Sequence, residues 1–299
     1  MTRRIYSLVV LAMLLTAAVT ANAAVTGRFE RTLQVPGTVD LEIATGSGNV
    51  TVKTGPPGTM HIIGTIRANS FFGGGEDRVR AIEQNPPISQ TGGIIRIGRN
   101  TDSNLMQNIS ISYDVVVPAE TVLKSSTGSG DQNISGLKNA VRISTGSGEL
   151  KINSIGGAVR ASTGSGNIEI ADVTGSVNAQ TGSGELHIRN SGAVELSTGS
   201  GTIEVSGVRG GAHAKTGSGD IRVNGEATAP WQLHTGSGDV KVQLQNSKYD
   251  LDANTSSGSI AVGPQIAIER SDRHHMRGKV NGGGTLLEIQ TSSGDIDVR

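Results

Sequence analysis

A four-residue corner, Thr-[Gly/Ser]-Ser-Gly, occurs ten times in this chain. It begins at Thr45, Thr127, Thr145, Thr163, Thr181, Thr198, Thr216, Thr235, Thr255 and Thr291. From Thr127 to Thr255 successive corners lie 18, 18, 18, 17, 18, 19 and 20 residues apart. A near-constant period of this length is typical of a solenoid, in which each repeat is one supersecondary unit stacked on its neighbours.

Apolar residues flank the corners with a period of two. Positions −4, −2, +5 and +7, counted from the corner Thr, are apolar in nearly every repeat, and around Thr145 they are Val141, Ile143, Leu150 and Ile152. This alternation predicts two short strands, each with one buried face, joined by the corner. We therefore predict an all-β fold, a parallel β-solenoid (β-helix or β-roll) built from two-strand rungs of about 18 residues.

The corner residues themselves are interpreted as structural. A tight corner calls for a positive φ, which glycine adopts without steric cost. The corner Thr is expected to lie inside or at the corner, where its hydroxyl bonds a stacked Thr or the turn backbone. The turn glycines expected on this basis are Gly128, Gly130, Gly146, Gly148, Gly164, Gly166, Gly182, Gly184, Gly199, Gly201, Gly217, Gly219, Gly236 and Gly238.

Outward positions carry charge in a regular order. Along the stack, position +6 reads Lys151, Glu169, His187, Glu204, Arg222 and Lys241. Because the signs of neighbouring rungs mostly alternate, cross-strand pairing is favoured. We interpret this column as a solvated charge ladder and not as a binding surface.

The period fails first between Thr45 and Thr127. Strand-like segments occupy residues 60–66, 94–97 and 109–117, and residues 76–84 form an amphipathic helix that ends before Pro86. An open end of a solenoid exposes unpaired backbone. We therefore predict that a small α/β insertion, spanning residues 55–125, caps the N-terminal end of the stack.

The period fails again between Thr255 and Thr291, where one rung is predicted to have lost its corner and gained a basic loop. The candidate contact residues in this loop are Arg270, Arg273, His274, His275, Arg277 and Lys279. Such a loop is either a solvated excursion or a contact site for an acidic partner or membrane surface. The last rung, residues 287–298, has no evident C-terminal cap, so we expect it to offer an edge for self-association.

The N-terminal residues have the features of a secretory signal peptide. Arg3 and Arg4 precede an apolar run over residues 7–18, and small residues follow at 21–23. With no second apolar run and no cysteine, we expect no transmembrane segment, disulfide or lipid anchor in the mature chain.

The predicted organisation is a signal peptide at 1–23, N-terminal strands and capping insertion at 24–126, the regular solenoid at 127–262, and an irregular loop with the last rung at 263–299. The mature chain is expected to be periplasmic, outer-surface-associated or secreted.

Charge and composition bear on the possible partners and reactions. The 26 basic and 26 acidic residues cancel, which argues against nucleic-acid binding. A calcium ladder needs several oxygen ligands around each ion, whereas the position after Gly-Ser-Gly supplies one carboxylate in some rungs and none in others. Asp220 and Asp239 are the best stacked acidic pair for a glycan-active enzyme, and turn chemistry explains them better. We therefore predict no catalytic residue, cofactor or metal site.

A family resemblance is carried by three features: the repeated STGSG-[DEN]-[ILV]-x-[ILV] corners, ISYDVVVPAETVLKSSTGSG at 111–130, and GGGTLLEIQTSSGDIDV near the C-terminus. Over roughly residues 28–299 the chain resembles the bacterial "putative adhesin" family, a β-strand-repeat domain of unknown function found in envelope proteins. The resemblance implies a β-solenoid outside the cytoplasm and transfers no catalytic residue. Our leading hypothesis is a non-enzymatic scaffold that binds a protein or glycan of the cell envelope through its repeat faces. The alternatives are a self-assembling or stress-signalling envelope component and a glycan-active β-helix enzyme.

Overall fold

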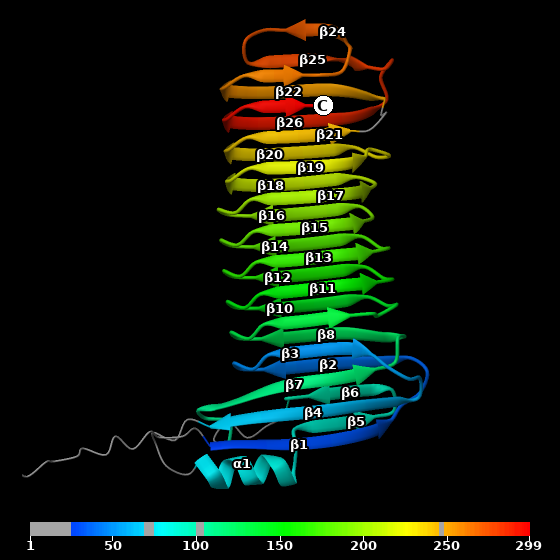
Figure 1. Cartoon of the computed structure of the whole chain (residues 1–299), viewed down its shortest axis with the longest axis vertical. Coiled ribbons are helices and arrows are strands. Elements are labelled where there is room, and N and C mark those ends of the chain that lie inside the picture. The colour runs from blue at the N-terminus through cyan, green and yellow to red at the C-terminus, as the bar shows by residue number, and fades with distance from the viewer. Residues whose placement is uncertain (1–24, 69–74, 100–104, 245–247) are drawn as a thin grey trace, which may run out of the picture.

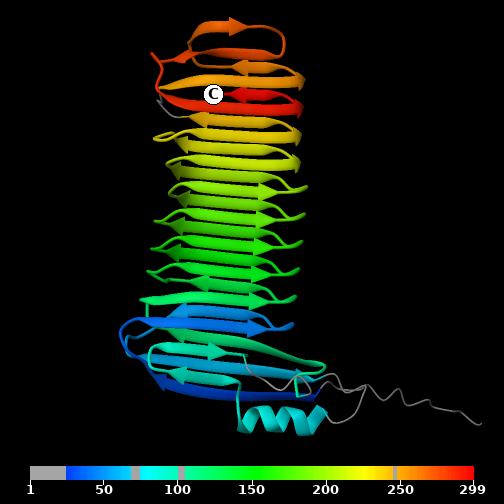
Figure 2. The ribbon, with the colours of Figure 1, turned by 180° about the vertical axis from the view of Figure 1, so that it is seen from behind.

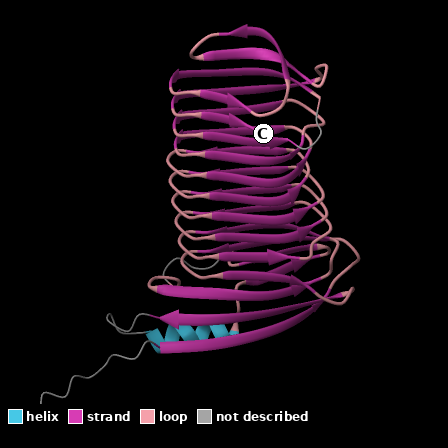
Figure 3. Cartoon of the chain, turned by 45° about the horizontal axis from the view of Figure 1, so that its top comes forward, coloured by secondary structure: helices cyan, strands magenta, loops and turns pink. Residues whose placement is uncertain are grey.

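The computed structural model describes residues 25–68, 75–99, 105–244 and 248–299, which form a tall rod of two facing β-sheets (Figure 1). The predicted signal peptide, residues 1–23, lies outside the described residues. Each regular rung contributes one strand to each sheet, and the turns between the sheets run along opposite sides of the rod (Figure 3). The prediction of an all-β parallel solenoid is confirmed.

Sheet A contains one strand of each regular rung. Within the described residues its spatial order is β1 (Val25–Gln34), β4 (Thr59–Ala68), β7 (Ile109–Val117), β3 (Val50–Thr54), β9 (Gln132–Ser135), β11 (Leu150–Ile155), β13 (Ile168–Val173), β15 (Leu186–Ser191), β17 (Ile203–Arg209), β19 (Ile221–Glu226), β21 (Val240–Leu244), β27 (Ile296–Val298) and β23 (Ile260–Val262).

Sheet B contains the partner strand of each rung. Its order, again within the described residues, is β24 (Ile266–Ser271), β25 (His275–Val280), β22 (Tyr249–Ser257), β26 (Thr285–Ser293), β20 (Trp231–Ser237), β18 (Ala212–Ser218), β16 (Val194–Thr198), β14 (Val177–Thr181), β12 (Val159–Thr163), β10 (Val141–Thr145), β8 (Thr121–Thr127), β2 (Val39–Thr45), β6 (Ile94–Ile97) and β5 (Ile88–Thr91).

The repeat sets the register of both sheets. In sheet B, Thr145 lies opposite Thr127 on one side and Thr163 on the other. The apolar residues of this rung, Val141, Ile143, Leu150 and Ile152, are all buried between the sheets. The core is therefore a continuous column of short strands whose inner residues stack on the same position of the next rung.

The N-terminal end of the rod is covered by the inserted segment. Strand β4 pairs antiparallel with β7 and β1 pairs antiparallel with β4, which extends sheet A. Helix α1 (Gly75–Gln84) packs across β1 and β4 with Val79 and Ile82 buried (Figure 2). The edge strand β1 is partly protected because the Arg28 N–H donates to the Glu83 carboxylate at 2.8 Å. An edge treated in this way is a poor template for a further strand.

The C-terminal end differs from the sequence prediction. Strand β26 lies between β20 and β22, and β27 lies between β21 and β23, so the last rung is an internal layer (Figure 1). The prediction that this rung offers a free edge for self-association is wrong, because β26 and β27 are each paired with a strand on both sides. The end of sheet B is instead the antiparallel hairpin β24–β25, which the basic segment forms, and no rung has lost its corner there.

The reason for the corner glycines also needs correction. Among the fourteen predicted turn glycines only Gly238 has a positive φ, of 153°. A Cβ on Gly164 would instead lie 2.4 Å from the carbonyl oxygen of Gly146 in the preceding rung. Glycine is needed at the corners because successive backbones approach too closely for a side chain. In three regular rungs a left-handed residue lies instead in the return turn, at Ser154, Asp172 and Asn190, with φ of 57°, 56° and 50°.

Candidate functional site

The corner hydroxyls are occupied by structural hydrogen bonds. Thr163 Oγ1 donates to the carbonyl oxygen of Gly148 in the preceding rung at 3.1 Å and accepts from the N–H of Gly166 in its own corner at 3.1 Å. The same pattern occurs at Thr127, Thr145, Thr181 and Thr198. Because each hydroxyl is buried and used twice, the column ties rungs together and presents no nucleophile.

The carboxylates after the corner have a similar role. Asp220 Oδ1 accepts from the N–H of Asp239 at 3.0 Å, and Asp239 Oδ1 accepts from the N–H of Asp295 at 2.9 Å. Asn167 makes the same bond to the N–H of Glu185 at 2.9 Å. Where this position holds Asp or Asn, the side-chain oxygen accepts a bond from the next rung whether it is charged or not. In the described part of the chain no group of three metal-ligating side chains comes together.

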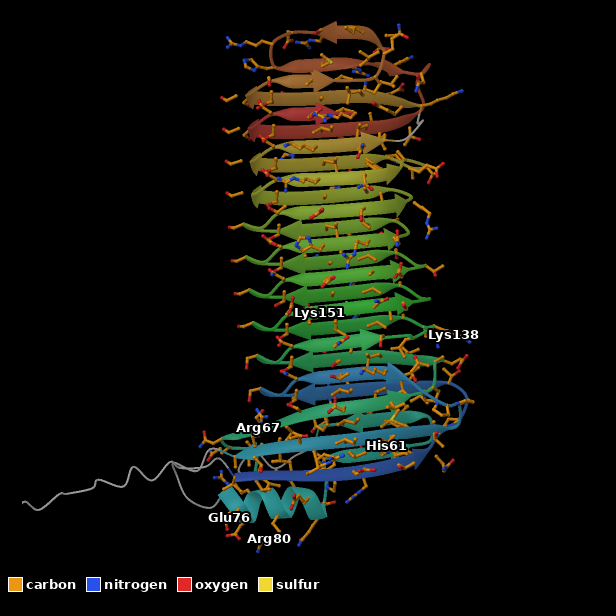
Figure 4. All side chains as sticks on the ribbon, viewed as in Figure 1. His61, Arg67, Glu76, Arg80, Lys138 and Lys151 are labelled. Atoms are coloured by element: carbon orange, nitrogen blue, oxygen red, sulfur yellow. The ribbon has the colours of Figure 1, made fainter. Side chains whose placement is uncertain are left out.

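Several charged side chains on the outer face of sheet A form ion pairs with one another. Lys151 lies on this face (Figure 4) and pairs with Glu149 at 3.1 Å, and this hydrogen bond raises the pKa of the lysine. Arg222 pairs with Asp220 at 2.6 Å, and His187 lies between two glutamates. The strand pairing confirms that the +6 residues of successive rungs lie opposite one another. Lys151 and Arg222 in this column also pair with an acid of their own rung.

The basic segment of the sequence prediction forms the capping hairpin β24–β25, where most of its charge is balanced locally. Its polar contacts are Arg270 with Asp272 at 3.1 Å, Arg277 and Lys279 with Glu269 at 3.6 Å each, and His275 with Asp252 at 2.9 Å. Backbone N–H groups of His274 and His275 also donate to Asp272, and the first of these is the main cause of its lowered pKa. Arg273 is exposed at the hairpin tip. A contact role for this segment stays a prediction.

A stack of like charges occurs on the outer face of sheet B. Lys124, Arg142 and Arg160 occupy position −3 of three successive rungs and lie directly opposite one another in the register. Lys124 pairs with Glu42 at 3.2 Å. Among the residues that the structure describes, neither Arg142 nor Arg160 has an ion pair or side-chain hydrogen bond, and both are exposed. We call these three residues the basic stack.

A shallow groove of about 470 Å³ runs beside the basic stack. Its apolar lining comes from position −5, where Val122, Ala140 and Ala158 are exposed on successive rungs. Small side chains at this column leave the groove open, and the long side chains of the basic stack form one wall. The groove therefore combines an apolar floor with a positive edge.

The sequence interpretation did not find this surface, although a signal for it was present. Once the corner Thr fixes the register, position −3 reads Lys, Arg and Arg in the rungs of Thr127, Thr145 and Thr163. At position +6 the signs mostly alternate, which indicates a solvated charge ladder. At position −3 three successive residues carry the same sign, and this is the pattern that indicates a binding surface.

The fold and these surfaces define a two-sheet parallel β-solenoid with polar outer faces. A family model described as Toastrack DUF4097 matches residues 27–299, and the chain belongs to this family. Within the described residues, no helix is long and apolar enough to cross a membrane.

A comparison with solved structures returns matches that include two named for adhesion. A "putative adhesin" from Bacteroides fragilis is 14% identical, with a TM-score of 0.46, over 91% of this chain and 97% of its own. A "putative cell adhesion protein" from Clostridium sporogenes is 13% identical, with a TM-score of 0.22, over 91% of this chain and 99% of its own. A "Putative lipid binding protein" from Parabacteroides distasonis is 13% identical, with a TM-score of 0.43, over 91% of this chain and 97% of its own. A comparison with curated proteins returns no match.

Proposed function

We propose that this protein is an exported, non-enzymatic, adhesin-like scaffold that binds a component of the bacterial cell envelope through an outer face of its rod. The observation that carries the proposal is the contrast between the two faces. Sheet A pairs Lys151 and Arg222 with its own carboxylates, whereas sheet B leaves Arg142 and Arg160 exposed beside an open groove. A surface that keeps its charges unpaired is suited to a charged partner.

The polar groups inside and at the corners support a role without catalysis. Thr163 is bonded twice to backbone, and Asp220 and Asp239 hold the N–H groups of the next rung. Groups committed to structure in this way are poor general acids or nucleophiles. The signal-peptide features of residues 1–23 support export.

The test is capture of an envelope component from the organism that makes the protein. Mature chain immobilised through its C-terminus is incubated with envelope extract, and a variant with both Arg142 and Arg160 changed to Gln serves as the matched control. We expect a component to be retained by the wild-type rod and lost with the variant. Equal recovery on both, or none on either, would contradict the proposal.

End-to-end self-association is a second candidate, favoured by the exposed edge of β24. This strand is paired on one side only, to β25, and Ile268 on it is 57% exposed. An open antiparallel edge with an exposed apolar residue can pair with a second copy of itself. Light scattering of the mature chain would then show a dimer that Ile268→Lys converts to a monomer. A monomer at all concentrations would rule this candidate out.

A further inference from the structure

We infer that the basic stack binds a short acidic stretch of polysaccharide with one carboxylate on each sugar unit. This inference rests on the proposed envelope-binding function and names the ligand class for the sheet B face. The argument depends on the charge, spacing, lining and length of the surface.

The charge of the stack is unfavourable for the protein alone. Arg142 lies opposite Lys124 on one side and Arg160 on the other, and like charges directly opposite in a sheet are destabilising. On sheet A the register places Lys151 opposite Glu169, and Lys241, although opposite Arg222 on one side, lies opposite Asp297 on the other. Lys124 is paired with Glu42, but among the described residues Arg142 and Arg160 have no acidic partner, so an anionic group from outside would be needed to pair with them.

The spacing of the stack fits a linear anion. Successive strands of a sheet lie about 4.8 Å apart, so the three cations form a single file with a repeat close to the length of one sugar unit. A guanidinium presents two parallel N–H groups to a carboxylate, which gives both strength and orientation. One carboxylate per sugar unit would therefore meet one cation per rung.

The surroundings of the stack offer what a sugar ring needs. On one side, Val122, Ala140 and Ala158 form an apolar strip that can contact the C–H face of a ring. On the other side, position −1 supplies the half-buried hydroxyls of Ser126, Ser144 and Ser162. Hydroxyl donors and acceptors of this kind match the hydroxyls of a sugar.

The surface has defined ends. Beyond Lys124 the same column holds Glu42, which pairs with Lys124 at 3.2 Å and also with Arg96 at 3.5 Å and Arg99 at 2.9 Å. Beyond Arg160 it holds Asn178, whose amide donates to Glu195 at 2.6 Å. At one end the Glu195 carboxylate would repel a longer acidic chain, and at the other end Glu42 already pairs with the cations that lie beyond the stack. The site therefore accepts about three charged units, from the rung spacing.

A membrane surface fits these observations less well. The cations form one file only, and Val122 is the one bulky apolar residue that is exposed in the described lining of the groove. Peripheral membrane binding draws on a larger buried apolar face together with its basic residues. Acidic sugar chains are therefore favoured over anionic lipid.

The experiment measures binding of galacturonate oligomers of increasing length to the mature chain by calorimetry. Methyl-esterified trimer is the uncharged ligand control, and phosphatidylglycerol vesicles test the lipid alternative. The double change Arg142→Gln and Arg160→Gln is compared with Arg222→Gln and Lys241→Gln, which removes the same charge from sheet A.

We expect the trimer to bind, the ester not to bind, and affinity to level off beyond three units. The sheet B double variant should weaken trimer binding at least about tenfold, because each lost contact is a charge-assisted hydrogen bond. The sheet A double variant should stay within about twofold of wild type, since its cations are far from the stack. Added salt should weaken binding to the wild type.

Equal losses in the two double variants, no saturable trimer binding, or binding to vesicles without binding to the trimer would each overturn the inference. These failures are separable from failure of the proposed function. If the wild-type rod still retains an envelope component that the Arg142→Gln and Arg160→Gln variant loses, the proposed function stands and only the ligand class is wrong. If nothing is retained from the envelope, the proposed function fails first.

Discussion

Thr145 donates its hydroxyl hydrogen to the carbonyl oxygen of Gly130, one rung earlier, across 3.0 Å. The hydroxyl oxygen of Thr145 in turn accepts from the N–H of Gly148 at 3.1 Å. Thr145 is buried, so water cannot replace either bond without opening the corner. One side chain therefore both shapes its own corner and attaches it to the neighbouring corner.

Replacing Thr145 by Val keeps the shape of the side chain and removes both bonds. The Gly148 N–H and the Gly130 carbonyl then lose a partner in a buried site, and we expect a loss of about 1–3 kcal/mol in the free energy of unfolding. Urea unfolding followed by circular dichroism measures the change. Ser147→Ala, at an exposed position of the same corner, is the control and should shift stability by no more than about 0.5 kcal/mol. A Thr145→Val protein as stable as this control would contradict the role of the hydroxyl.

The corner glycines offer a second test with a matched pair. Gly46 and Gly164 occupy the same corner position, yet an added Cβ meets nothing within 4 Å at Gly46 and lies 2.4 Å from a backbone oxygen at Gly164. We expect Gly164→Ala to cost about 1–3 kcal/mol through overpacking and Gly46→Ala to be tolerated within about 0.5 kcal/mol. Thermal unfolding of the two variants decides the point. Equal costs would indicate that backbone conformation, and not close approach, selects glycine.

The comparison of Gly46 with Gly164 also shows which features of the corner can be predicted from the sequence alone. The spacing of the corners predicted the register, because one residue of slip would place every inner side chain outside. It could not predict why glycine is required, since positive φ and close approach select the same residue. The difference lies in the distance between two rungs, which is a property of the stack.

The spatial order of the rungs of Thr255 and Thr291 could not be predicted from the sequence for a related reason. The rungs of Thr255 and Thr291 carry equivalent inner residues, Leu251 with Ala253 and Leu287 with Ile289. Either could stack on β20 as far as apolar patterning is concerned. The hairpin β24–β25 pairs with β22 and thereby fixes β22 as the outer rung, so the later rung closes the space between. A local period defines a rung but not its neighbours.

The acidic column after the corner predicts a dependence of stability on pH. Asp295 Oδ1 accepts from the Ser259 N–H at 2.8 Å and the Ser259 hydroxyl at 2.9 Å, and the backbone bond is the main cause of its lowered pKa. Since the pKa in the folded state lies below the unfolded value near 4, the stabilisation is complete above that value. It is lost as pH falls through the folded pKa.

Asp295→Asn separates this charge from the hydrogen bond. Asn167 makes the equivalent bond elsewhere in the column, so the amide oxygen should keep the Ser259 contact at neutral pH. We expect the urea midpoint of the variant to fall less than that of wild type between about pH 5 and pH 2. Parallel midpoint curves for the two proteins would show that the Asp295 charge does not contribute.

The basic stack makes a prediction that a purely structural surface would not. Arg142→Glu places a carboxylate between Lys124 and Arg160, which converts two repulsive cross-strand pairs into attractive ones. We expect the variant to be more stable than wild type by about 0.2–1 kcal/mol at low salt, with the difference shrinking as salt is added. Arg142→Gln, which removes repulsion without adding attraction, should fall between them in urea unfolding.

The same Arg142→Glu change should abolish binding of an acidic ligand, so stability and binding would move in opposite directions. A variant that loses stability would instead show that Arg142 supports the fold, and the case for an exposed binding surface at this position would fail.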